Sequence, residues 1–227
     1  MTTKSHSVNN EHLTRQYDIL PPEKTSVPIT IIGAGAIGSL TTLSLAKMGF
    51  SDITIYDFDE IEVENMNCQF YRFKDIGSKK VFALQDLIKD FTGVEIKAIP
   101  EKYESGIFKG IVISAVDSMA VRKLIWDNHR GKTINTKYII DPRMGAEEAM
   151  MYTMNPMDLK DIESYEKTLY TDDNAVHERC TAKATMYTAS MLSGLVAKSV
   201  KDIVTEGQIP RVAIWSIKHN DFMCWSE

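Results

Sequence analysis

Residues 27–38 read VPITIIGAGAIG, and this stretch decides the fold. Its first six residues are mostly β-branched and lack polar alternation, which predicts a strand buried on both faces. The strand runs directly into Gly33-x-Gly35-x-x-Gly38. In such a loop the first glycine makes the tight turn, the second lets a phosphate approach the backbone, and the third lets the next helix pack on the sheet. The stretch therefore predicts a nucleotide site, the alternative being a glycine-rich turn that binds nothing.

Two neighbouring features support the nucleotide interpretation. Residues 37–48 have helical spacing and Gly49 fits the helix end, so the free N–H groups of a helix N-terminus would face a phosphate. Asp57 ends the next predicted strand, 19 residues after Gly38, where a carboxylate can accept hydrogen bonds from ribose hydroxyls. The glycine pattern alone does not say which nucleotide binds.

The rest of the chain predicts an α/β fold: a Rossmann-like, mostly parallel sheet flanked by helices, with an antiparallel C-terminal extension. Strands and helices alternate as far as residue 141, which indicates parallel strands with crossover connections. Beyond it, short strands joined by turns and one long helix change the rhythm. The expected strands are 27–32, 52–56, 94–99, 110–116, 138–141, 149–154, 211–217 and 221–225, and the expected helices are 37–48, 79–91, 118–129 and 182–204.

No linker divides the chain, so we expect one domain over residues 1–227, with residues 1–14 as a flexible polar arm. Residues 158–178 are acidic and poorly periodic, and Thr181 is a plausible N-cap for the long helix after them. The acidic stretch is interpreted either as a lid or channel that guides a basic partner tail, or as an ordinary solvated loop.

Composition excludes several classes of protein. The net charge of −5 provides no basic field for nucleic acid, and no apolar run is long enough to span a membrane. The first residues lack the apolar core of a signal peptide. Cys68, Cys180 and Cys224 lie far apart, which argues against a disulfide framework or zinc ribbon and favours the cytoplasm.

Residues beyond the glycine loop favour ATP-dependent activation of a carboxylate. That reaction needs cations on the triphosphate, an acidic group that holds Mg²⁺, and a carboxylate kept near the α-phosphate. Asn65 and Gln69 follow the second strand, Lys80 opens the next helix, and Asp117 ends the strand GIVISAV. A parallel strand's carboxyl end is where ligands bind in such sheets.

Together these segments resemble the ThiF/MoeB/HesA-type adenylyltransferases, bacterial relatives of ubiquitin-activating enzymes. The segments are LTRQYDIL, IIGAGAIGS, YDFDEIEVENMNCQ, DIGSKKVFAL, AVDSMAVR and ERCTAKA, which together cover nearly the whole chain. Each segment alone is a weak signal, whereas the set is specific.

The resemblance implies adenylation of a C-terminal carboxylate, usually the Gly-Gly end of a small ubiquitin-like or sulfur-carrier protein. It places Gly33, Gly35 and Gly38 at the phosphates of ATP and Asp57 at the ribose. It places Asn65, Gln69 and Lys80 around the nucleotide and makes Asp117 the Mg²⁺ ligand. It also implies a homodimer, because Arg15 is similar to an arginine that reaches the neighbouring subunit's ATP.

One position departs from the family pattern. Family members commonly carry an arginine in the turn N-x-x-R-Q, and here that residue is Cys68. A cation is therefore missing where phosphate charge must be stabilised, and Arg72 is the candidate to replace it. We expect Cys68 to be a small buried residue rather than a nucleophile.

Cys180 is a second cysteine of interest, because it precedes the long helix beside Arg179 and Lys183. A helix N-terminus and neighbouring cations favour a thiolate. The position resembles the cysteine that accepts the activated carboxylate as a thioester in some family members. The alternative is a small residue that packs the crossover.

Three functional hypotheses remain from the sequence. The first is an ATP-dependent adenylyltransferase that uses Mg²⁺, with Arg143 and Gly145 lining a groove for the partner's tail. The second is an NAD(P)-dependent oxidoreductase with the same glycine loop, although no clear acid–base residue for a nicotinamide is evident. The third is a degenerate scaffold that binds nucleotide without turnover, which the cysteine at position 68 motivates.

Overall fold

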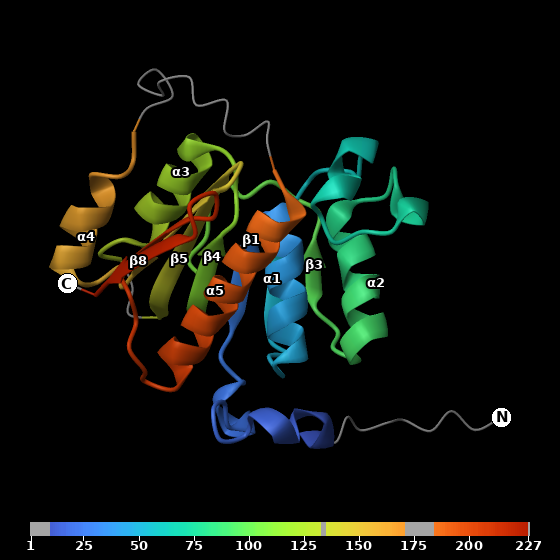
Figure 1. Ribbon diagram of the computed structural model, residues 1–227, viewed down its shortest axis with the longest axis horizontal. Helices are drawn as coiled ribbons and strands as arrows, with labels where there is room; N and C mark the ends of the chain where they lie inside the picture. The colour runs from blue at the N-terminus through green and yellow to red at the C-terminus, as the bar shows by residue number, and fades with distance from the viewer. Residues whose placement is uncertain (1–9, 133–134, 171–183, 227) are drawn as a thin grey trace.

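The fold is built around one mixed β-sheet (Figure 1). The computed structural model describes residues 10–132, 135–170 and 184–226. In that part of the chain the sheet has eight strands in the order β3-β2-β1-β4-β5-β6-β7-β8. β3, β2, β1, β4 and β5 are parallel, whereas β6, β7 and β8 continue the sheet in antiparallel pairing. The strands are β1 (Ile29–Ile32), β2 (Ile53–Tyr56), β3 (Lys97–Ile99), β4 (Gly110–Ser114), β5 (Thr136–Gly145), β6 (Glu148–Met154), β7 (Val212–Ser216) and β8 (Asp221–Trp225).

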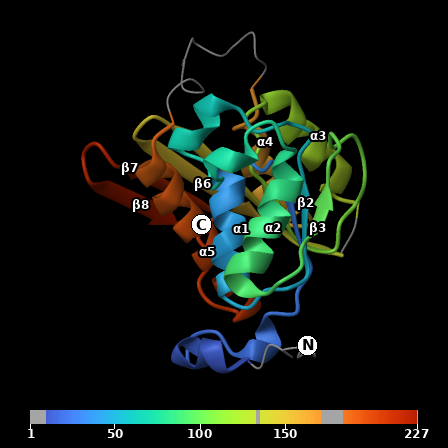
Figure 2. The ribbon, with the colours of Figure 1, turned by 90° about the vertical axis from the view of Figure 1, so that its right-hand side faces the viewer.

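Helices cover both faces of the sheet, as Figure 2 shows. One apolar core joins α1, α2 and α5 to one face, and a second core joins α3 and α4 to the other. β1 and β4 are buried along their whole length because helices lie on both sides of them. The helices are α1 (Ala36–Lys47), α2 (Lys80–Thr92), α3 (Met119–His129), α4 (Leu159–Glu166) and α5 (Met186–Val204).

The strand order reverses between β1 and β4. From β1 the chain adds β2 and β3 on one side, and then returns to add β4 and β5 on the other. In open α/β sheets such a reversal leaves a crevice outside the carboxyl ends of the two strands, where ligands bind. The expected α/β fold with an antiparallel extension is confirmed, and the fold places the loop after β1 beside the loop after β4.

The N-terminal segment packs at the C-terminal end of α1, which is the end remote from the glycine loop. It contains two 3₁₀ helices, η1 (Asn10–Gln16) and η2 (Pro22–Lys24), drawn in blue at the bottom of Figure 1. Leu13 is buried and meets Gly49, and the Gln16 side chain donates a hydrogen bond to the Met48 carbonyl at 2.7 Å. Among residues 10–14, which were expected to belong to a flexible arm, Leu13 therefore packs against the end of α1.

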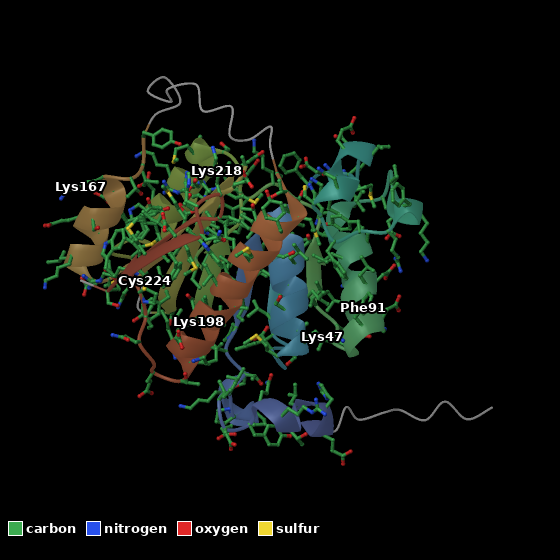
Figure 3. The ribbon with its side chains drawn as sticks, viewed as in Figure 1. Lys47, Phe91, Lys167, Lys198, Lys218 and Cys224 are labelled. Carbon is green, nitrogen blue, oxygen red and sulfur yellow. The ribbon has the colours of Figure 1, made fainter. Side chains whose placement is uncertain are left out.

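α1 and α2 are joined at the same end. The Lys47 ammonium donates a hydrogen bond to the Phe91 carbonyl at 2.6 Å and lies 5.8 Å from the centre of the Phe91 ring (Figure 3). Both contacts fix the ends of the two helices that lie far from the glycine loop.

Several boundaries differ from the sequence-based predictions. β5 extends over ten residues instead of four because it pairs with both β4 and β6. β3 keeps only the last three of the six residues expected. α5 begins at Met186 with Thr185 as its N-cap, later than the expected start at residue 182. The proposed cap, Thr181, lies outside the described residues.

The acidic stretch at 158–178 contains a helix that the sequence analysis did not predict. Asp158 caps α4 by accepting hydrogen bonds from the N–H groups of Lys160 and Asp161. The helix buries Tyr165 and partly buries Ile162, so its apolar stripe is too short to show periodicity. None of the described helices combines the length and the apolar character that a membrane span needs.

His129 is a fully buried residue at the end of α3. Its Nε2 accepts a hydrogen bond from the Phe108 N–H at 3.2 Å, and its Nδ1 lies 2.7 Å from the Ile125 carbonyl oxygen. Because a carbonyl can only accept, Nδ1 carries the proton and the folded imidazole is neutral. Burial lowers the pKa of His129 below its ordinary value.

We expect this histidine to make the protein sensitive to mild acid. The unfolded chain binds a proton at this histidine below about pH 6.5, whereas the folded chain does so only at lower pH. The free energy of unfolding should therefore fall between pH 7.5 and pH 5.5, by at most about 1.4 kcal/mol per pH unit from this residue. Urea unfolding of wild type and His129→Gln measures this slope, which should be shallower in the variant. Equal slopes would show that His129 titrates alike in both states.

Candidate nucleotide-binding site

Each glycine of the loop has a different steric environment. Gly33 has a φ of +100°, and a Cβ there would lie 2.3 Å from the Ala115 carbonyl oxygen. A Cβ on Gly38 would lie 1.9 Å from the Gly33 carbonyl oxygen. A Cβ on Gly35 would meet no atom within 4 Å. Gly33 and Gly38 are thus required by packing, whereas Gly35 leaves open space at the surface of the loop.

That open space lies at the N-terminus of α1. Gly35 is the N-cap residue of the helix, and no side chain caps it. The first N–H groups of a helix lack partners within the helix and carry a partial positive charge. A negatively charged oxygen in front of Gly35 would meet these groups, so the loop fits a nucleotide phosphate.

Asp57 and Tyr71 hold Ala34, the residue between the first two glycines. The Asp57 Oδ2 accepts a hydrogen bond from the Ala34 N–H at 2.6 Å, and the Tyr71 hydroxyl donates one to the Ala34 carbonyl at 2.6 Å. The other carboxylate oxygen of Asp57 accepts the Asp59 N–H at 2.8 Å. Each carboxylate oxygen has two acceptor positions, so Asp57 can still receive ribose hydroxyls.

Asn65 lies in the 3₁₀ helix η3 (Val63–Asn67), and the N–H groups of Cys68 and Gln69, which follow the helix, donate to the Asn65 carbonyl. Asn65 accepts the Glu62 N–H through Oδ1. The Gln69 Oε1 is buried, and no described residue bonds to it. An orphaned buried amide is costly, and a bound ligand would satisfy it. The segment is fastened to α1 by a hydrogen bond from the Phe70 N–H to the Ser39 Oγ at 3.0 Å.

Cys68 is buried, as expected, with 6% of its surface exposed. Burial raises the pKa of its thiol, which keeps the sulfur protonated and unreactive. The nucleophile alternative for this cysteine therefore has no support in its surroundings.

Lys80 opens α2 as predicted, and its side chain is buried. The ammonium lies 3.0 Å from the Asp59 carboxylate, while the Lys80 N–H donates to the Asp59 carbonyl at 3.1 Å. The lysine therefore faces the loop after β2 rather than open solvent. Because Asp59 already neutralises it, Lys80 brings less free positive charge to a phosphate than an unpaired lysine would.

Asp117 lies just beyond the carboxyl end of β4 and is exposed. The Ala115 N–H donates to the Ile32 carbonyl at 2.8 Å, which aligns this end of β4 with the end of β1. Ser118 then caps α3. The structure thus sets the end of β4, two residues before Asp117, against the glycine loop.

A buried ionic cluster supports this end of the sheet, and sequence reasoning missed most of it. Arg122 pairs with Asp141, which is fully buried, and also donates to the Val116 carbonyl just before Asp117. Burial and the nearby Arg143 lower the pKa of Arg122 to about 10, so it stays charged at neutral pH. The Tyr165 hydroxyl donates to Asp141 at 2.8 Å. Because Arg122 bonds to the main chain of Val116, it helps to fix the position of the backbone just before Asp117.

Arg143, expected to line a groove for a partner's tail, is a member of this cluster. It lies 2.8 Å from Asp141, and its two terminal nitrogens donate to the Thr168 carbonyl and hydroxyl at 3.0 Å each. Its guanidinium also stacks on Tyr152, 4.6 Å from the ring centre. Arg143 therefore ties the end of α4 to the sheet.

Of the remaining predicted residues, Arg72 and Arg15 are described by the structure. Arg72 forms ion pairs with Asp75 at 2.7 Å and with Asp90 of α2 at 3.4 Å. Arg15 is exposed on η1, beside the end of α1 remote from the glycine loop. Cys180 lies outside the described residues.

Tyr71 and Asp59 are the site residues that sequence reasoning missed. Asp59 carried a signal, because it is the second acid of the DFD segment after β2. Tyr71 carried none, since a tyrosine in a polar loop does not indicate which carbonyl it will bind.

Comparisons with known proteins agree with this geometry. The profile of the ThiF family matches residues 24–224. An Arabidopsis thaliana NEDD8-activating enzyme E1 catalytic subunit is 34% identical over 106 residues, which cover 44% of this chain and 23% of that protein. The ubiquitin-like modifier-activating enzyme 5 of Caenorhabditis elegans is 33% identical over 66 residues, covering 29% of this chain and 15% of that protein. The chain thus spans less than a quarter of either relative.

Solved structures with the same fold match nearly the whole chain. PaaA superposes with a TM-score of 0.73 at 18% identity, covering 99% of this chain and 84% of that one. Escherichia coli MccB, solved with ATP, gives a TM-score of 0.74 at 16% identity, covering 95% of this chain and 71% of that one. At these identities the comparison establishes the fold.

The loop glycines give a matched pair of variants. Gly38→Ala should lower the free energy of unfolding by about 1–3 kcal/mol because its methyl group overlaps the backbone of Gly33. Gly35→Ala should change it by less than about 1 kcal/mol, since its φ suits alanine and its space is open, yet weaken binding of nucleotide phosphates. Urea unfolding followed by circular dichroism measures the free energy of unfolding of both variants. Equal losses of stability would contradict the different roles assigned to the two glycines.

Proposed function

The chain belongs to the ThiF family, and on that premise we propose that it is an ATP-dependent adenylyltransferase. Its substrate in this proposal is the C-terminal carboxylate of a small ubiquitin-like or sulfur-carrier protein. The observation that carries the proposal is that the β1–β4 strand reversal sets the glycine loop against the end of β4, two residues before Asp117. An oxidoreductase would need only the first of these two features.

The reaction transfers AMP from ATP to the carboxylate. A carboxylate oxygen attacks the α-phosphorus, the bond from that phosphorus to the bridging oxygen breaks, and pyrophosphate leaves with the electron pair. No proton needs to move, so catalysis rests on alignment of the two reactants and on neutralisation of phosphate charge. These are the tasks that the site residues have to perform.

The glycine loop and the segment after β2 would bind the nucleotide. Gly35 and the start of α1 would receive phosphate oxygens, and Asp57 would receive ribose hydroxyls. Gln69 supplies a buried amide oxygen that accepts no hydrogen bond from any described residue, which fits a ligand in this position. Asn65 keeps its amide nitrogen as a donor, since its oxygen already accepts the Glu62 N–H.

Magnesium fits the site only as an ion shared with the substrate. No group of three or more acidic, histidine or cysteine residues among the described ones could hold a metal. Magnesium commonly binds through one or two carboxylates together with substrate phosphates, and in this proposal Asp117 would supply one carboxylate. Bound there, the ion would offset negative charge on the phosphates.

Among the residues that the structure describes, positive charge is scarce beside the loop. Lys80 is shared with Asp59, and position 68 holds a neutral thiol. Arg72 remains our candidate to stand in for the missing arginine, but it would have to leave its pair with Asp75. This shortage favours a further cation from outside the protomer.

Arg15 would supply that cation to a second copy of the chain. It lies beside the end of α1 remote from the loop, and a helix of 12 residues is about 18 Å long. An arginine side chain cannot cross that length to its own loop. The proposal therefore includes a homodimer in which each Arg15 reaches the partner's nucleotide.

We propose the carboxylate substrate from the proteins to which this chain is similar. The relatives named above activate ubiquitin-like modifiers by name, and MccB has been solved with MccA and with ATP. A partner with a C-terminal Gly-Gly tail is our first candidate. Passage of the activated carboxylate to Cys180 as a thioester, with AMP leaving, belongs to the proposal, as does a cytoplasmic location.

We expect Mg-ATP to stabilise the protein and NAD or NADP not to do so. A ligand at 100 times its Kd adds about 2.7 kcal/mol, which raises the Tm by several degrees. Asp117→Asn should weaken binding of Mg-ATP about tenfold, because one charged ligand of the shared ion is lost. Thermal unfolding with each nucleotide, with and without Mg²⁺, measures both effects.

Asp127→Asn is the matched control, since Asp127 lies on α3 in an exposed ion pair with Lys123. It should bind Mg-ATP like the wild type. Stabilisation by NAD alone would make the protein an oxidoreductase and reject the proposal. If nucleotide binds as expected, exchange of labelled pyrophosphate into ATP with small Gly-Gly-ended proteins tests the acceptor.

The cysteine at position 68 gives a gain-of-function test. Cys68→Arg should tighten ATP binding about tenfold, because a charged hydrogen bond to phosphate contributes roughly 1.5–3 kcal/mol. Cys68→Ser should leave the Kd unchanged, which controls for loss of the thiol. Titration with a fluorescent ATP analogue measures both variants. A folded Cys68→Arg protein with the wild-type Kd would show that position 68 does not face the phosphates.

A further inference from the structure

The peptide unit between Ala34 and Gly35 is held in one orientation by Tyr71. The Tyr71 hydroxyl lies 2.6 Å from the Ala34 carbonyl oxygen, and it is the donor because a carbonyl only accepts. The preceding peptide unit is held separately by the bond from the Ala34 N–H to Asp57. The two peptide units at the centre of the loop thus have one side chain each to fix them.

Fixing the carbonyl also fixes the next N–H. The peptide is trans and planar, so the Ala34 carbonyl and the Gly35 N–H point in opposite directions. With the carbonyl turned to Tyr71, the Gly35 N–H is directed away from Tyr71. No described residue accepts a hydrogen bond from that N–H, and Gly35 borders the open space in front of α1.

The environment of Tyr71 suits a permanent donor. Burial, Asp57 and Asp59 together raise the pKa of its hydroxyl well above the ordinary value. The phenol therefore keeps its proton at any physiological pH. The Phe70 N–H, next to Tyr71, donates to the Ser39 Oγ of α1, and this bond keeps the main chain of Tyr71 close to the loop.

We propose that Tyr71 is a positioning residue for the phosphate loop, which aims the Gly35 N–H at a phosphate oxygen of ATP. This inference rests on the proposed function, because it needs ATP in the site. It assigns to a neutral side chain part of the alignment that a cation at position 68, three residues earlier, would otherwise provide.

Tyr71→Phe removes the hydroxyl alone and tests the inference. Freed from its bond, the Ala34–Gly35 peptide can rotate, and the Kd for ATP should rise about 3- to 10-fold, the effect of one hydrogen bond. The Kd for adenosine, which has no phosphate, should stay unchanged. Competition against a fluorescent ATP analogue on the full chain measures both constants.

Tyr103→Phe is the matched control. Tyr103 is also buried and its hydroxyl also donates to a main-chain carbonyl, that of Gly106 at 2.8 Å, but it lies in the core beside α3. This variant should bind ATP and adenosine like the wild type. Comparing the two variants separates loss of a buried hydroxyl from loss of loop alignment.

Two outcomes would overturn the inference, and a third would overturn its premise. An unchanged Kd for ATP in Tyr71→Phe would show that the peptide keeps its orientation without the hydroxyl. Equal weakening of ATP and adenosine would show a general structural role. A wild-type protein that fails to bind ATP at all would reject the proposed function, and the inference with it.

Discussion

The contact between Gly33 and the end of β4 is the constraint on which the rest of the site depends. β1 is paired with β4 along its full length, and at the carboxyl ends of the two strands the backbone of Gly33 passes so close to Ala115 that no Cβ fits between them. This approach is possible because Gly33 takes a φ that side chains disfavour. It sets the glycine loop against the turn that carries Asp117. A residue with a side chain at position 33 would separate the two parts.

Charge is the second theme of the site. ATP carries several negative charges, yet the groups nearest the loop include Asp57, Asp59 and Asp117, with Lys80 shared with Asp59. In our proposal a shared magnesium ion, the N-terminus of α1 and an arginine from a second copy make up the difference. Backbone dipoles act best when they are fixed before the ligand arrives. The two hydrogen bonds that hold Ala34 are therefore of more than local importance.

The buried cluster of Arg122, Asp141 and Arg143 plays a supporting part. Its members link the end of β4, the middle of β5 and the end of α4 by ion pairs and hydrogen bonds. Replacing one partner would leave a buried charge without its counter-ion, which is strongly destabilising.

The sequence by itself determined the fold class, the glycine loop and the candidate residues that follow β2 and β4. These depend on local features: a β-branched run, three glycines at fixed spacing, and polar residues directly after strands. Only the tertiary structure decided what each side chain touches. Tyr71 bonds to Ala34, which lies 37 residues earlier in the sequence, and Asp141 bonds to Tyr165, which lies 24 residues later. α4 depends on a cap and a packing surface rather than on periodicity. Local patterns specify elements, whereas hydrogen bonds between distant residues form only once the sheet has placed those residues together.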